Sequence, residues 1–64
     1  MDIKAFIIKS KVADIPNEMI FDMISEAVLS AKDVLISEVN SGSVTIEAAI
    51  NNGLDVVYDN YMES

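Results

Sequence analysis

The first residues of the chain form a short, mostly apolar run. Residues 3–9 contain three isoleucines and one phenylalanine, interrupted by Lys4 and closed by Lys9. β-Branched and aromatic side chains are enriched in strands, and no pattern typical of helix capping precedes the run. This pattern predicts an N-terminal β-strand over residues 3–9.

A helical pattern follows the predicted strand. Asp14 and Asn17 are capping residues, Pro16 suits a first helical turn, and Glu18 faces the positive end of the helix dipole. The sequence Asn-Ser-Gly at positions 40–42 is a typical helix stop. We therefore predict an amphipathic helix from about residue 16 to about residue 39. The apolar residues of its main face recur at spacings of three, four and seven: Ile20, Met23, Ile24, Ala27, Val28, Ala31, Val34 and Leu35.

The last third of the chain fits two patterns. A helix capped by Thr45 would place seven apolar residues on one face: Ile46, Ala49, Ile50, Leu54, Val57, Tyr58 and Tyr61. A β-hairpin would alternate apolar and polar residues on both sides of an Asn-Asn-Gly turn at positions 51–53. We favour the helix, because its apolar face continues across Gly53. In that case replacing Gly53 by alanine should stabilise the helix by up to about 1 kcal/mol, whereas a hairpin turn would be destabilised.

These elements predict an α+β mini-domain that spans residues 1–64 as a single domain. It consists of the N-terminal strand, the long amphipathic helix and the second helix. A lone strand is not stable, so we expect it to pair with the same strand of a second copy. The alternative is a strand-helix-strand-strand unit, with the helix packed on a three-stranded antiparallel sheet. The residues predicted for self-association are Ile3, Ala5, Phe6, Ile7 and Ile8.

The strand-helix-helix layout is similar to that of ribbon-helix-helix proteins. Residues 15–19 resemble their strand-to-helix junction, and residues 43–50 resemble the start of their second helix. The predicted first helix is longer than theirs and the body is more acidic, so we do not assign the chain to that family. The resemblance implies a dimeric DNA-binding regulator whose N-terminal ribbon carries Lys4, Lys9 and Lys11.

The composition combines a high apolar content with a high negative charge. The chain has 64 residues, 52% of them hydrophobic, and a net charge of −7. So small a domain has little interior, which suggests that another chain covers part of the apolar surface. We therefore predict a homo-oligomer, with a dimer favoured. No stretch is long and apolar enough for a membrane span and no signal peptide is recognised, so we expect no membrane association and a cytoplasmic location.

The residue types exclude most catalytic chemistry. The chain has no cysteine and no histidine, and its two glycines stand apart from any phosphate-binding motif. We therefore predict that the protein is not an enzyme and binds no cofactor or metal. Asp55, Asp59 and Glu63 would form a row on a helix, but such a row is more typical of a solvated face than of a cation site.

Charge is distributed unevenly. Residues 1–11 hold three lysines against one acid, whereas residues 12–64 hold one lysine against ten acids, so direct binding to nucleic acid is not expected. Acids on the outer side of the long helix have no lysine four residues away. Beside them lie a leucine and an isoleucine, seven positions apart. Apolar residues next to unneutralised acids suit a partner whose surface is basic and partly apolar. The predicted partner-binding residues are Asp22, Glu26, Leu29, Asp33 and Ile36.

Three functions follow from these patterns. The favoured one is a small acidic regulator, adaptor or inhibitor that occupies a basic surface of a partner protein. The alternatives are the DNA-binding regulator described above and a structural, self-assembling subunit. A simpler explanation of the acids is that they keep the chain soluble, with Leu29 and Ile36 packed by the C-terminal segment.

Overall fold

The structure is a computed structural model that describes residues 1–37 and 45–63. These residues form three helices, α1 (Ile3–Val12), α2 (Asn17–Ser37) and α3 (Ile46–Glu63). No strand occurs in the described part of the chain. The predicted α+β fold is therefore wrong, and so are the strand-paired dimer and the strand-helix-strand-strand alternative.

The segment predicted as a strand forms helix α1 instead. Asp2 is its N-cap, since the Ala5 N–H donates to Asp2 Oδ1 at 2.7 Å. Lys9 and Lys11 lie in the last turn, where positive charge is favourable. Phe6 and Ser10, one turn apart, are both buried. A cap and a buried i, i+4 pair thus outweigh the strand propensity of the isoleucines.

Helix α1 ends in a tight turn around Asp14. The Asp14 N–H donates to the Lys11 carbonyl at 3.1 Å, and the Ile15 N–H donates to the Ser10 carbonyl at 3.0 Å. These two bonds form a Schellman motif, which requires a left-handed residue, and Asp14 has φ of 61°. Asp14 therefore closes α1, whereas the sequence had suggested that it caps the next helix.

The two long helices follow the predicted periodicity. Helix α2 confirms the predicted amphipathic helix over the described residues, and positions 38 and 39 lie outside them. Helix α3 begins as predicted, because the Ala48 N–H donates to Thr45 Oγ1 at 3.1 Å. The hairpin alternative is wrong, and the sequence Asn-Asn-Gly at positions 51–53 lies inside a helix.

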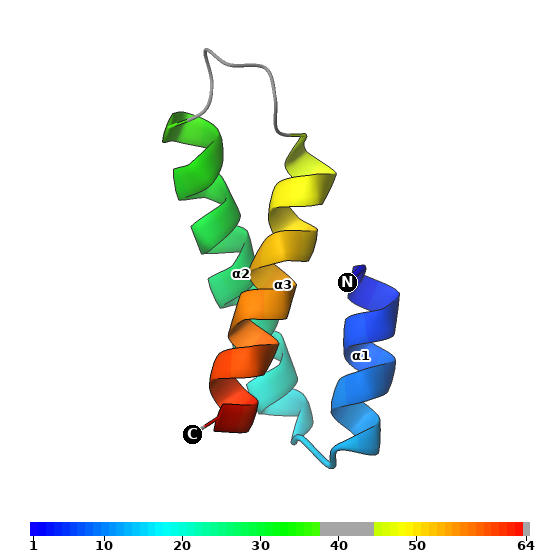
Figure 1. Cartoon of the computed structure of the whole chain (residues 1–64). Helices are drawn as coiled ribbons and strands as arrows, with labels where there is room; N and C mark the ends of the chain where they lie inside the picture. The colour runs from blue at the N-terminus through cyan, green and yellow to red at the C-terminus, as the bar shows by residue number, and fades with distance from the viewer. Residues whose placement is uncertain (38–44, 64) are drawn as a thin grey trace.

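The core lies mainly between α2 and α3, which run antiparallel, and α1 packs beside one half of this pair (Figure 1). The Phe6 side chain joins α1 to the pair, and its ring meets the Tyr58 ring edge to face at 6.3 Å. The amino group of Met1 also contacts α3 through Asp55 Oδ1 at 2.7 Å. The buried residues of the core cluster are Phe6, Ile15, Ile20, Met23, Ala27, Leu54 and Val57.

Gly53 sets the separation of α2 and α3. A Cβ atom at this position would lie 2.8 Å from the carbonyl oxygen of Ala27 and 3.2 Å from its Cα. Both atoms belong to the backbone of α2, so no side-chain rotation can relieve the contact. The helix is present, but this contact reverses the expected effect, and we expect Gly53→Ala to destabilise the protein.

Candidate interaction surfaces

The predicted partner-binding residues lie on the outer side of α2, and we call this set the outer stripe: Asp22, Glu26, Leu29, Asp33 and Ile36. All five are exposed, because the opposite side of the helix packs Met23, Ala27 and Ala31 into the core. Leu29 is 61% exposed and Ile36 is 63% exposed. The C-terminal helix therefore does not cover Leu29 or Ile36, in contrast to the simpler explanation given above.

Asp22 and Glu26 of the outer stripe do not pair with the lysines of α1. Asp22 and Glu26 form no ion pair with any residue in the described ranges. Lys9 Nζ lies 4.9 Å from the centre of the Tyr58 ring, and Lys11 Nζ donates to Asn17 Oδ1 at 3.1 Å. The lysine-bearing ribbon expected of a DNA-binding dimer is thus replaced by a helix, two of whose lysines contact the protein itself.

The residues predicted for self-association do not form one surface. Phe6 is fully buried in the core, and Ile7 is half-buried against it. Ala5, Ile3 and Ile8 are exposed, but helical periodicity directs Ile3 and Ile8 to different sides of α1. The set was predicted because a lone strand would need a partner strand, whereas the helix directs these residues to different sides.

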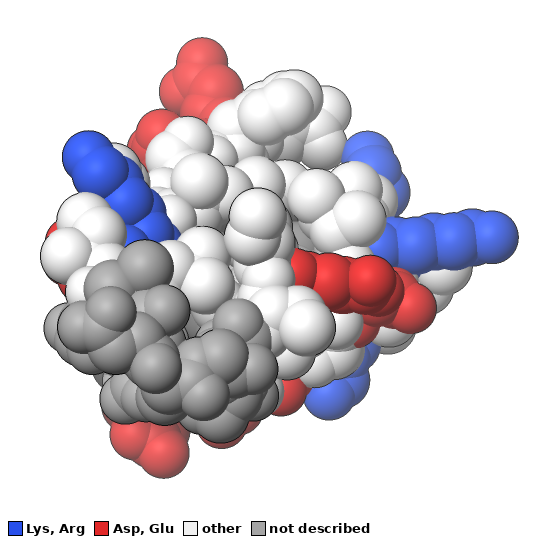
Figure 2. Space-filling model, turned by 90° about the horizontal axis from the view of Figure 1, so that it is seen from above, with Lys and Arg blue, Asp and Glu red and all other residues white. Residues whose placement is uncertain are grey.

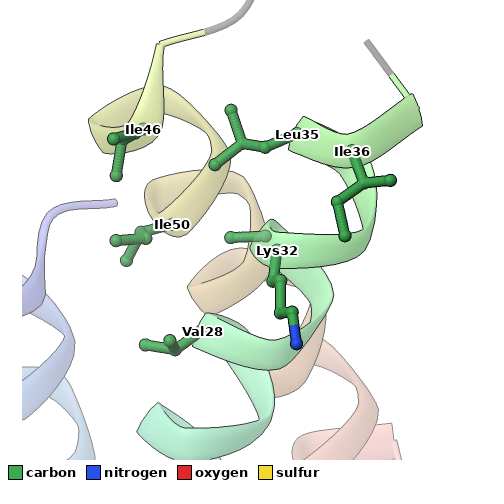
Figure 3. A pocket seen from close by; sticks show the side chains of 7 residues that line it. Val28, Lys32, Leu35, Ile36, Ile46 and Ile50 are labelled. Atoms are coloured by element: carbon green, nitrogen blue, oxygen red, sulfur yellow. The ribbon is translucent and has the colours of Figure 1, made fainter. Parts of the chain in front are cut away.

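A second surface lies between the loop-side halves of α2 and α3. It is a hollow of about 380 Å³, and we call it the apolar groove. Figure 3 shows Leu35 reaching from α2 toward α3, with Lys32 and Ile36 on the α2 side of the opening. Ile36 therefore belongs to both the outer stripe and the groove. The residues lining the groove are Val28, Ala31, Lys32, Leu35, Ile36, Ile46 and Ile50.

A neighbouring hollow extends the groove toward α1. It shares Ile46 and Ile50 with the groove and adds Asp2, Ile3, Glu47 and Asn51. Seen from the loop end, uncharged side chains form a broad area and most charged ones lie toward its margin (Figure 2). The two hollows therefore form one largely apolar surface with a few charges at its edge.

Several groove residues had been predicted to lie in the core. Val28 and Ile46 lie on the predicted apolar faces, yet they are 46% and 66% exposed. Lys32 is the feature of the sequence that could have indicated the groove. It is the one lysine beyond residue 11, and it lies four residues from both Val28 and Ile36, on the same side of the helix.

In residues 1–37 and 45–63, no three acidic side chains come together as a metal site would require. None of the helices in these ranges is both long and apolar enough to cross a membrane. The chain matches no protein-family model, no curated protein and no solved structure.

Proposed function

We propose that the protein is a non-catalytic regulator, adaptor or inhibitor that binds a basic surface of a partner protein through the outer stripe of α2. The observation that carries this proposal is the pairing of unpartnered acids, Asp22 and Glu26, with an exposed leucine, Leu29, on one side of a single helix. Exposed acids alone would only increase solubility, but an exposed leucine among them adds an apolar anchor.

The acids and the leucine have different roles in this proposal. Charges at the edge of an interface act mainly on the rate of encounter, and a net charge of −7 attracts a basic surface over about one Debye length. An apolar side chain that enters a pocket acts mainly on the dissociation rate. The outer stripe therefore predicts fast, salt-sensitive association and a dissociation rate that depends on Leu29.

The test compares two double variants with the same net charge. In Asp22→Lys/Glu26→Lys and in the control Asp59→Lys/Glu63→Lys, two acids become lysines, which adds four charges and changes −7 to −3. All four positions are exposed, so both variants should fold, as circular dichroism will show. Wild type and both variants are used as bait in lysates of the source cell and of any host.

A basic protein that wild type and the control capture, and that the α2 variant loses, supports the proposal. The purified partner then gives rate constants at low and high salt. We expect the α2 variant to lower the association rate at low salt at least about tenfold, and Leu29→Ala to raise the dissociation rate by about fivefold or more. If the captured partner associates with the α2 variant at the wild-type rate at low salt, the stripe serves solubility alone and the proposal fails.

A further inference from the structure

Helix α1 is too short to cover the pair formed by α2 and α3. It has 10 residues against 21 in α2, which corresponds to about 15 Å against about 31 Å. Figure 1 shows α1 beside the half of the pair that is remote from the loop. The apolar groove occupies the other half, where no third helix lies among the described residues.

Several large apolar side chains that line the groove are exposed. Val28, Ile36 and Ile46 are 46%, 63% and 66% exposed and come from both helices. Ile3, 47% exposed, extends this surface at the start of α1. Contiguous apolar surface of this kind typically marks an interface.

The charges beside the groove indicate what covers it. Lys32 lies at the α2 side and Glu47 at the α3 side, and neither forms a hydrogen bond or ion pair with any described residue. A basic partner would face Lys32, and an acidic partner would face Glu47. A surface with a positive charge on one side and a negative charge on the other is complementary to a second copy of itself that is turned by a two-fold rotation.

We propose that the apolar groove is the interface of a homodimer, in which α2 of each copy packs on α3 of the other. A two-fold axis along the groove brings Lys32 of one copy to Glu47 of the second copy, and the symmetry repeats the pair. Lys32 is five residues before the end of α2, and Glu47 is one residue after the start of α3. At 1.5 Å per residue they lie within about one helical turn in height, which is within reach of a lysine side chain.

A dimer interface of ordinary size would take a modest share of the surface of the chain. A standard interface buries about 800 Å² on each partner, which is roughly a sixth of the 4571 Å² surface of this chain. Groove-to-groove contact produces a four-helix arrangement, in which helices pack at about 8–10 Å. Ile36 of the outer stripe would be covered in this dimer, whereas Asp22, Glu26 and Leu29 do not line the groove and stay accessible, so dimerisation does not depend on the proposed function.

The first experiment measures mass by sedimentation equilibrium across the micromolar range. We expect wild type to have twice the chain mass of 7.0 kDa. Ile46→Glu should weaken the dimer at least about tenfold, because it places a charge in the interface. It should leave the fold intact, since Ile46 is exposed at the first turn of α3, where an acid is favourable.

The matched control is Val56→Glu, which adds the same charge at a position 58% exposed on the same helix but outside the groove. We expect it to remain dimeric. A wild type that stays at 7.0 kDa overturns the proposal. A dimer that survives Ile46→Glu, or that Val56→Glu dissociates to the same extent, places the interface elsewhere and also overturns it.

A charge exchange tests the pairing itself. Lys32→Glu and Glu47→Lys should each weaken the dimer, because each places like charges opposite one another. The double variant should restore it to within about threefold of wild type, as coupled residues do in a double-mutant cycle. Because Lys32 and Glu47 form no ion pair within one chain among the described residues, restoration indicates that they meet across the interface of two identical chains. Its absence refutes the two-fold arrangement described here.

Discussion

Replacement of Gly53 by alanine tests how closely α2 and α3 approach. Two effects oppose each other. Alanine is more favourable than glycine inside a helix by up to about 1 kcal/mol. Against this, the new Cβ atom would lie 2.8 Å from the Ala27 carbonyl oxygen, well inside the ordinary contact distance of about 3.5 Å.

The steric effect should be the larger one. Because the obstructing atoms are backbone, the two helices must move apart by roughly 0.5 Å, and overpacking of this kind typically costs about 1–3 kcal/mol. Such a gap also weakens the dispersion contacts on both sides of Gly53 by about a quarter. We therefore expect a net loss of about 1–2 kcal/mol, or a fall in melting temperature of at least about 4 °C for a domain of this size.

The control is Asn52→Ala at the adjacent, exposed position of the same helix. It gains helix propensity of about 0.5 kcal/mol and meets no close neighbour, so its melting temperature should rise. Thermal unfolding is followed by circular dichroism at one protein concentration, because association shifts the midpoint. A Gly53→Ala variant that melts at or above wild type would show that the helices can separate at no cost and would refute this account of their packing.

Substitutions at three further positions test the local structure of α1, each by urea unfolding. Asp14 has φ of 61°, which glycine adopts more easily than other residues, so Asp14→Gly should stabilise the protein by about 0.5–1 kcal/mol and Asp14→Ala should destabilise it. A change in stability of the same sign for both variants would contradict the left-handed turn. Ser10→Ala should stabilise the protein by about 1 kcal/mol, since the buried Ser10 Oγ has no hydrogen-bond partner among the residues that the structure describes. A loss of stability would show that such a partner exists. Asp2→Ala should cost about 1 kcal/mol, and Asp2→Asn should recover most of it; equal losses would argue against the cap.

Helix α2 could be predicted without a competing pattern, whereas α3 could only be favoured over a hairpin that fitted the same residues. Helix α2 repeats its apolar spacing over 21 residues, and α3 adds a capping threonine, Thr45, to a face that continues past Gly53. Helix α1 has 10 residues, and its apolar side chains lie on several sides, so helix and strand patterns fit it almost equally well. Its cap, Asp2, is the local signal that distinguishes them.

The surfaces could be predicted only in part. Helical periodicity alone places Asp22, Glu26 and Leu29 away from the core, and their exposure in the structure agrees with that placement. Their role in binding stays a prediction. The apolar groove could not be found in the same way, because Val28 and Ile46 do lie on the core-facing sides of their helices. Whether they are covered depends on how far a third helix extends along the pair formed by α2 and α3, which is set by the tertiary structure.

The attachment of α1 has a consequence for amide hydrogen exchange. Helix α1 contacts α3 much less extensively than α2 does, and Phe6 is its main anchor in the core. Elements held by few buried contacts open locally at a lower free energy than the whole domain. We therefore expect the amides of α1 to exchange sooner than those at the centre of α2 and α3. Each such opening withdraws Phe6 and joins its vacated site to the apolar groove, so the exposed apolar face briefly runs the full length of the helix pair.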